Sequence, residues 1–372
     1  MSQYSKRRWW LALILAFSTS ALLFSNSAVM GEENAEVQQS EDTSGTPEEL
    51  LDEKGFLNLK DLGIELPSER GRGVIDEGIL DGSQTAGPVV VFKKIISGGR
   101  AVIHGTTMPK WLVGDIQMTF SRPTALAVKG NSLYVVDAAR SAVFRYNLER
   151  DTLEIVIDTS EHFKGEPSAL FVGKDGAVYV VDPAGSQVVS FNANGKKTFV
   201  YKDDMNLARP VDVHVNDDAD QVYIADAGFG RITVFKKNGG PIYTIGVKGS
   251  GLGQFTNPVA FAVFDGNLYV VDNGGVPLQV LPASGDPYAI GEEELNRPNT
   301  IAVDNYGRIY VADNQNYYIY VFNDGSLIEK FGGASRDPNS FRDVADLYID
   351  GDSLYIADIV NQRIQVYAIT PP

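Results

Sequence analysis

One five-residue pattern recurs six times between residues 133 and 358. It consists of an aliphatic residue, a tyrosine, two further apolar residues and a terminal aspartate. Successive terminal aspartates lie 45, 44, 46, 41 and 45 residues apart. A repeat of about 40 to 50 residues built from short strands has the length of one propeller blade. The pattern therefore predicts six copies of one unit, whose aspartates are Asp137, Asp182, Asp226, Asp272, Asp313 and Asp358.

The same strand order surrounds each copy of the pattern. A proline-led apolar run such as residues 123–128 comes first, and a third strand such as residues 231–235 follows the aspartate. A fourth strand is clearest at residues 242–246, and Asp-Gly or Asn-Gly pairs separate the strands. Because glycine adopts the positive φ that tight hairpins need, each unit is an expected antiparallel meander. The predicted fold is an all-β, six-bladed β-propeller of four-stranded antiparallel blades.

The sixth unit lacks a fourth strand, because the chain ends shortly after residues 363–367. An upstream strand must therefore complete the last blade and remove the exposed edges. We expect this strand at residues 110–114, around Trp111, which precede the first unit much as residues 242–246 precede the fourth. A further hairpin within residues 88–104 either extends that blade or begins a partial seventh one.

The repeated unit resembles the NHL repeat. Its closest stretches are Asp313-Asn314 and residues 361–367, which read Asn-Gln-Arg-Ile-Gln-Val-Tyr. The resemblance covers residues 108–369 and implies a six-bladed propeller, here in an exported bacterial member of the family. The fourth unit departs from the pattern because residues 276–280 lack the arginine, and the sixth has Asp343-Val344 in place of the proline.

The region before the repeats has two parts. Residues 1–31 combine Lys6, Arg7 and Arg8 with an uncharged apolar run and then small residues, which is typical of a secretory signal peptide. An uncleaved anchor is the alternative, since residues 9–30 carry no charge and reach the length needed to span a membrane. Residues 32–87 read as an acidic, flexible linker with one short helix near 47–54. Residues 88–372 form the expected propeller with its extra N-terminal strands.

Charge and cysteine content exclude several classes of function. The formal net charge is −16, and beyond the leader basic residues cluster only in pairs, so nucleic acid is not an expected partner. The chain has no cysteine and therefore no disulfide, thiolate metal ligand or thiol nucleophile. The leader, rather than the absence of cysteine, predicts a periplasmic or secreted protein, which touches a membrane only through the leader if it stays uncleaved.

The residues that repeat and those that vary predict different roles. One aspartate per blade is more than an active site requires, so we expect the six aspartates to brace turns at the ends of the second strands. Ligands of propellers usually meet the channel entrance, which the loops before the inner strands surround. The residues at that junction vary and read Arg122, Glu166, Arg209, Asn257, Arg297 and Arg342, followed inside by Thr124, Ser168, Asp212, Val259, Asn299 and Asp343.

Two kinds of ligand fit these variable residues. Four arginines around one entrance can bind an anionic group such as a carboxylate, a sulfate or a uronic acid. Carboxylates and amides converging inside the channel can instead hold calcium, an arrangement that resembles the axial metal sites of some propeller lactonases. The candidate calcium ligands are Glu166, Asp212, Asn299, Asp343 and Asp346. Zinc is not expected, because His214 is the only histidine on a predicted inner strand.

No nucleophile elbow, phosphate loop or zinc-protease motif is present in the sequence. We therefore expect a binding scaffold without enzymatic activity and without a cofactor, which presents a propeller face to an envelope or extracellular protein or to a glycan. The alternative is a calcium-dependent hydrolase or lyase with its site in the channel.

Overall fold

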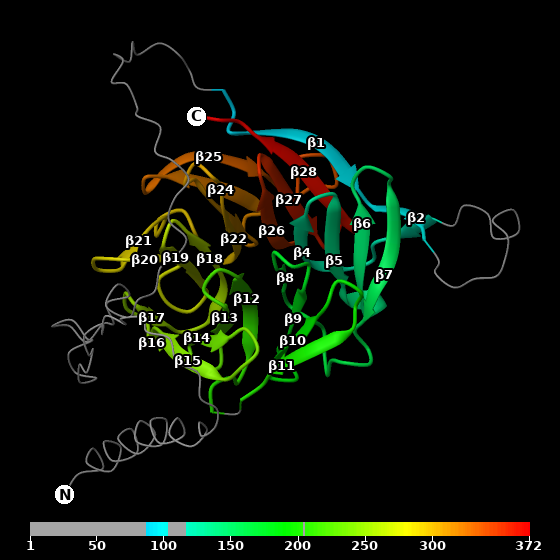
Figure 1. The fold of residues 1–372 in the computed structure, drawn as a ribbon. Coiled ribbons are helices and arrows are strands. Elements are labelled where there is room, and N and C mark those ends of the chain that lie inside the picture. The colour runs from blue at the N-terminus through cyan, green and yellow to red at the C-terminus, as the bar shows by residue number, and fades with distance from the viewer. Residues whose placement is uncertain (1–86, 103–116, 204) are drawn as a thin grey trace, which may run out of the picture. The chain divides into compact units, whose positions relative to one another are not determined.

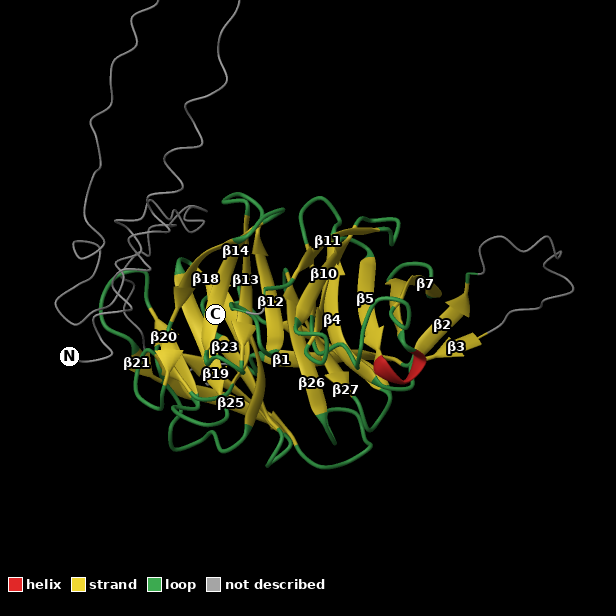
Figure 2. Ribbon diagram, turned by 90° about the horizontal axis from the view of Figure 1, so that it is seen from below, coloured by secondary structure: helices red, strands yellow, loops and turns green. Residues whose placement is uncertain are grey.

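The structure is a computed structural model that describes residues 87–102, 117–203 and 205–372. Across those ranges the chain folds into β-strands and one short 3₁₀ helix, η1 (Ala138–Arg140). Six antiparallel meanders of four strands form a ring (Figure 1), and in Figure 2 their strands run between the two faces of that ring. This confirms the predicted all-β, six-bladed propeller.

The four strands of each blade follow one another outward from the axis. Blade one contains β4 (Pro123–Lys129), β5 (Ser132–Asp137), β6 (Ala142–Asn147) and β7 (Thr152–Asp158). Blade two contains β8 (Leu170–Val172), β9 (Val178–Asp182), β10 (Gln187–Phe191) and β11 (Lys197–Tyr201). Blade three contains β12 (Pro210–Asn216), β13 (Gln221–Asp226), β14 (Arg231–Lys236) and β15 (Pro241–Ile245).

The remaining blades repeat this order. Blade four contains β18 (Pro258–Phe264), β19 (Asn267–Asp272), β20 (Leu278–Leu281) and β21 (Tyr288–Ala289). Blade five contains β22 (Pro298–Val303), β23 (Ile309–Asp313), β24 (Tyr318–Asn323) and β25 (Ser326–Gly332). Blade six contains β26 (Val344–Asp350), β27 (Ser353–Asp358), β28 (Arg363–Ile369) and, from the other end of the chain, β1 (Val90–Ile96).

Strand β1 closes the ring. It pairs antiparallel with β28, from Val90 opposite Ile369 to Ile96 opposite Ile364, and the N–H of Thr370 donates to the carbonyl of Val89 at 2.8 Å. The prediction that an upstream strand completes the last blade is confirmed. Its placement around Trp111 is wrong, because β1 occupies that position; Trp111 itself lies outside the described residues. The predicted signal peptide, the linker up to residue 86 and the helix near 47–54 also lie outside them.

Residues 88–102, the described part of the segment expected to form a hairpin, do not form one, because β1 and the strand after it do not pair with each other. After β1 the chain continues into β2 (Gly98–Ala101), which pairs with the outer strand of blade one, parallel to β7, and with β3 (Gln117–Thr119). One short stretch of chain thus joins the last blade to the first. A small parallel pair, β16 (Val247–Lys248) with β17 (Gln254–Phe255), lies in the connection from blade three to blade four.

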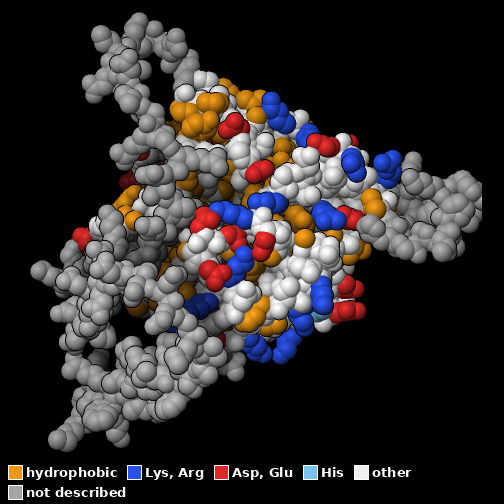
Figure 3. All heavy atoms as spheres, viewed as in Figure 1, with side chains coloured by type: hydrophobic (Ala, Val, Ile, Leu, Met, Phe, Trp, Pro, Cys, Tyr) orange, Lys and Arg blue, Asp and Glu red, His pale blue; other side chains and the backbone are white. Residues whose placement is uncertain are grey.

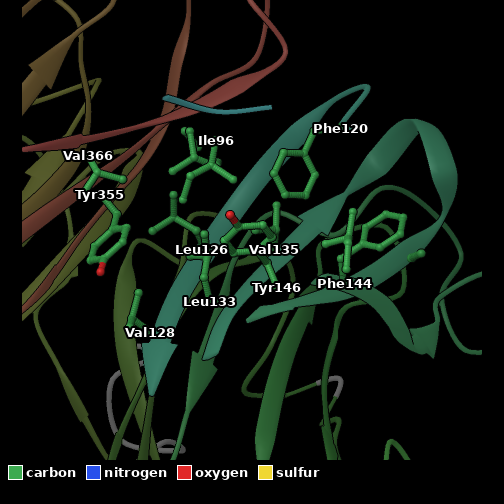
Figure 4. Close-up of a cluster of buried hydrophobic side chains, with 14 residues drawn as sticks. Ile96, Phe120, Leu126, Val128, Leu133, Val135, Phe144, Tyr146, Tyr355 and Val366 are labelled. Carbon is green, nitrogen blue, oxygen red and sulfur yellow. The ribbon is translucent and has the colours of Figure 1, made fainter. Parts of the chain in front are cut away.

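Both faces of every blade are buried against its neighbours. In β5, Leu133 and Val135 point into a cluster shared with blade six, whereas Tyr134 and Val136 point into a cluster shared with blade two. Alternate residues of a strand face opposite sides of the sheet, so a strand covered on both sides must be apolar at each position. The described residues form six such clusters, one at each junction between blades. Figure 4 shows the junction of blades six and one, where Ile96 of β1 packs beside Leu126 and Val366.

Replacement of Ile96 by alanine tests the role of β1 as the closing strand. Ile96 is 3% exposed and lies in the cluster between blades six and one, so we expect a loss of about 2–5 kcal/mol of unfolding free energy. Val91 in the same strand is 43% exposed, and Val91→Ala should change stability by less than about 0.5 kcal/mol. Chemical denaturation measures both. Similar small losses for the two variants would contradict ring closure by β1.

Candidate functional site at the channel

The six repeat aspartates hold the loops that enter the inner strands. Each carboxylate is buried, with 0–1% of the residue exposed, at the end of a second strand. Asp137 accepts hydrogen bonds from the N–H groups of Ser121 and Arg122 at 2.6 and 3.0 Å, and Asp226 accepts from Ala208 and Arg209 at 2.6 and 3.1 Å. The same arrangement links Asp272 to Asn257, Asp313 to Arg297 and Asp358 to Arg342. In blade two, Asp182 accepts a hydrogen bond from the backbone N–H of Lys164 rather than from that of Glu166.

These hydrogen bonds fix the backbone from which the variable entrance residues project. We call Arg122, Glu166, Arg209, Asn257, Arg297, Arg342 and Asp343 the mouth. Arg122 of blade one forms an ion pair with Glu166 of blade two at 2.5 Å, with about half of each side chain exposed. Arg209 of blade three donates to the amide oxygen of Asn257 of blade four at 2.5 Å. Figure 3 shows acidic and basic side chains gathered in the middle of this face.

Blades five and six meet at the mouth through Asp343. Asn314 donates to its carboxylate at 3.0 Å. Burial and the charge of Asp358 raise the pKa of Asp343, while the positive charges of Arg297 and Arg122 lower it. Among the side chains that form the mouth, four arginines stand against the carboxylates of Glu166 and Asp343, an excess of positive charge in a chain whose net charge is −16. The arrangement suits an anionic ligand rather than a cation.

Deeper in the channel, side chains link neighbouring inner strands. Thr124 donates to the carbonyl of Pro167, Ser168 to that of Val211, and Asn299 to that of Val344, at 2.9–3.3 Å. Asp212 of β12 accepts from the N–H of Phe261 in β18 at 2.9 Å, and Asp346 of β26 accepts from the N–H of Leu126 in β4 at 2.8 Å. Each inner strand is the edge of its own sheet, so these contacts satisfy groups that no strand ladder pairs.

The structural alignment of the inner strands differs from the one expected from sequence. A β-bulge follows the leading residue of the inner strand and shifts its register. We call the inner-strand residue that pairs with the residue just before the repeat aspartate the aligned channel position. It is Ala125 in blade one, Asp212 in blade three, Ala260 in blade four, Thr300 in blade five and Asp346 in blade six. The sequence alignment placed Asp212 with Thr124, Val259 and Asn299. These three residues directly follow the leading proline, whereas Asp212 is the second residue after it, so the alignment was wrong by one residue in blade three. In the structural register blades three and six carry aspartates, and these two blades are opposite one another in a ring of six.

The two channel aspartates have raised pKa values. Burial raises the pKa of Asp212 to about 6, although the N–H groups of Phe261 and Val213 favour its charged form. Burial also raises the pKa of Asp346 to about 7, and the negative charge of Asp212 adds to the effect. Removal of a carboxylate from water disfavours its ionised form, and a like charge across the channel does the same.

The candidate calcium ligands are separated by this geometry. Glu166 lies at the mouth in its pair with Arg122, whereas Asp212 and Asp346 lie inside the channel. Asn299 turns its N–H groups to the carbonyls of Val344 and Ala345. In the described parts of the chain, no three histidine, aspartate or glutamate side chains lie together as a metal site requires. The calcium hypothesis stays a prediction that now rests on Asp212 and Asp346.

The far end of the channel holds residues that the sequence analysis did not select. A cavity of about 400 Å³ lies where the inner strands end, lined among others by Phe171, His214, Tyr348, Asp265 and Asp350. The ring centroids of His214 and Phe171 are 4.8 Å apart, and burial lowers the pKa of His214 to about 4. Strand alternation places Asp212 with His214 and Asp346 with Tyr348 on one face, which is the signal that predicts this lining.

The curated proteins similar to this chain in sequence are NHL-repeat proteins. Human NHL repeat-containing protein 3 is 29% identical over 174 residues, which are 40% of this chain and 49% of the human protein. The mouse protein of that name is 29% identical over 240 residues, or 57% of this chain and 67% of the mouse protein. The chain thus spans about half the length of the human relative. No protein-family model matches it.

Solved structures show the same fold at low identity. A structural genomics protein of unknown function from Bacteroides thetaiotaomicron has a TM-score of 0.53 and 16% identity, covering 67% of this chain and 70% of its own. A streptogramin B lyase has a TM-score of 0.52 and 12% identity, covering 68% and 94%. Together, the six blades with their repeated aspartates and the similarity to NHL repeat-containing protein 3 identify the chain as an NHL-repeat β-propeller.

Proposed function

We propose that this propeller is an extracytoplasmic, non-enzymatic binding scaffold whose mouth engages an anionic group of an envelope or extracellular protein or of a glycan. The observation that carries the proposal is the positively charged mouth of an acidic chain, formed where the blades differ in sequence. Arg122, Arg209, Arg297 and Arg342 come from four blades, and buried aspartates anchor the backbone of all four. A preorganised set of guanidinium groups suits carboxylates and sulfates.

The polar groups inside the channel support a binding role over catalysis. Asp212 and Asp346 accept backbone hydrogen bonds that join neighbouring inner strands, and His214 packs between Phe171 and Phe261. A general base needs access to a reacting group, and a nucleophile needs an adjacent base. Turnover of a lactone or a glycan that disappears in Asp212→Asn or Glu166→Gln would overturn the non-enzymatic proposal.

A second candidate function is a calcium-dependent hydrolase or lyase. Asp212 and Asp346 favour it, because two carboxylates with raised pKa values near one another are frequent at functional sites. Calcium prefers oxygen ligands of this kind, with further ligands supplied by amides or carbonyls.

Removal of two mouth arginines tests the proposed scaffold. We expect the purified chain to bind polygalacturonate and poly-glutamate, and Arg209→Gln/Arg297→Gln to weaken this binding by about tenfold, since each tenfold is ~1.4 kcal/mol. Lys196→Gln/Lys197→Gln makes the same change of charge at an exposed turn of blade two and should leave binding unchanged. Calorimetric titration measures all three proteins. Equal losses in the two double variants would show that only the overall charge matters.

Calcium titration separates the two candidate functions. If the channel holds calcium, millimolar CaCl₂ raises the melting temperature, and Asp212→Asn together with Asp346→Asn abolishes the increase. For the scaffold we expect the same melting temperature in CaCl₂ and in EDTA. Elemental analysis of the purified chain provides the control, because a stoichiometric divalent ion would favour the enzyme.

The pH dependence of stability tests the channel aspartates without a ligand. The folded pKa of Asp346, about 7, lies above its usual value of 3.8, so the folded state binds the proton more tightly than the unfolded state. The stabilisation is present at low pH and is lost as the pH rises through about 4 to 7. Between pH 5 and pH 8 the unfolding free energy should therefore fall more in the native chain than in Asp346→Asn. Identical pH profiles from chemical denaturation would contradict the raised pKa.

A further inference from the structure

The cavity at the far end of the channel, called the far cavity below, has the size of a small-molecule site. Its volume of about 400 Å³ lies in the range of about 300–1,000 Å³ that such sites occupy. Its walls come from the ends of five inner strands: β4, β8, β12, β18 and β26. It lies at the opposite end of the inner strands from the mouth, and none of the mouth residues lines it.

Large side chains from three of the six blades line this space. The positions two residues beyond the aligned channel position are small in blades one, four and five, where they are Ala127, Ala262 and Ala302. In blades two, three and six they are Phe171, His214 and Tyr348, all of which line the cavity. Phe171 and His214 come from neighbouring blades, whereas Tyr348 comes from blade six, which is opposite blade three in the ring. These three rings, called the aromatic wall below, therefore border the cavity on two sides.

The aromatic wall is uncharged near neutral pH. Burial lowers the pKa of His214 to about 4, so its imidazole is neutral and does not repel a cation. Burial and the charges of Asp350 and Asp346 raise the pKa of Tyr348 to about 12, so its phenol keeps its proton. Neutral aromatic rings attract an organic cation through their faces.

The charges at the rim favour a cation. Lys174 is paired with Asp218 at 2.5 Å, and Lys237 is paired with Asp217 and Asp175 at 2.5 and 3.1 Å. Among the described residues, Asp265 and Asp350 line the cavity without an ion-pair partner within 4.0 Å, and Lys129 is the further cation there, near Asp350. The one ammonium group of Lys237 cannot offset both of its carboxylates, and Lys129 stands against both Asp265 and Asp350, so the rim keeps an excess of negative charge.

From this geometry we infer that the far cavity binds a small organic ammonium ion, held between the rings of Phe171, His214 and Tyr348 and the carboxylates of Asp265 and Asp350. Its size and aromatic wall suit an amine or quaternary ammonium compound with an apolar body. The inference is independent of the proposed role of the mouth, because the two sites share no residue.

Benzylammonium, benzyl alcohol and benzoate are suitable probes, because they share one ring and differ in charge. We expect benzylammonium to bind the purified chain most tightly, as measured by NMR titration of the ligand. Asp265→Asn/Asp350→Asn should weaken this binding by about tenfold, and Phe171→Leu should weaken it while preserving apolar volume. Thermal denaturation of each variant verifies that it folds.

The chain offers a closely matched control for Asp265. Asp265 and Asp324 both occupy a left-handed turn position, with φ of 45° and 48°, and both precede a glycine of φ 77–78°. Asparagine adopts this conformation readily, so both Asp→Asn changes preserve the turn. Only Asp265 lines the far cavity, so Asp324→Asn should leave benzylammonium binding unchanged.

Three results would overturn the inference. Equal affinity for benzyl alcohol and benzylammonium would show an apolar cavity without preference for a cation. Equal losses in Asp265→Asn and Asp324→Asn would place any binding elsewhere on the acidic surface. A complete lack of saturable benzylammonium binding at millimolar concentration would leave the cavity without the proposed ligand class.

Discussion

Hydrophobic contact between neighbouring blades is the interaction on which the rest of this molecule depends. Each blade is apolar on both faces, as Val135 and Val136 of β5 show by packing on opposite neighbours. A sheet with two apolar faces is stable only between two other sheets, so an open row of blades would leave two faces in water. The ring removes both ends at once, and the closing strand β1 is required because blade six otherwise lacks its outer edge.

Packing of six sheets around one axis also determines the chemistry of the channel. The inner strands crowd together, and the aligned channel position is alanine or threonine except at Asp212 and Asp346. These two carboxylates reach the backbone of the next blade, which makes them part of the framework. The side chains that differ between blades and remain free to bind a ligand therefore lie at the two ends of the axis. One end is the arginine-rich mouth, whose backbone the repeat aspartates hold, and the other is the far cavity with its aromatic and acidic side chains.

The fold was predictable from the sequence because the same apolar pattern and turn residues occur in six copies of one unit, and all six copies predict the same four-stranded blade. The closing strand was not predictable in the same way. Residues 110–114 and residues 90–96 are both short runs rich in apolar residues, and it is the pairing of residues 90–96 with β28 that identifies the closing strand. The entrance residues Arg122, Arg209 and Arg297 could be placed from their position before the prolines. The lining of the far cavity follows from strand alternation only once the register after each proline is known, and the bulge that sets this register was not predicted from the sequence.

Because β1 pairs with β28, the last blade cannot be completed until both of these distant strands have been synthesised. Each of the first five blades is built from a contiguous stretch of chain, so it can form as soon as that stretch is synthesised. Blade six needs β1, the first described strand, and β28, the last, which lie side by side in Figure 1. Once β1 has been synthesised it is an unpaired edge, and its partner β28 follows more than 260 residues later in the sequence. The ring therefore forms only if β28 is synthesised and pairs with β1 before another molecule binds that edge.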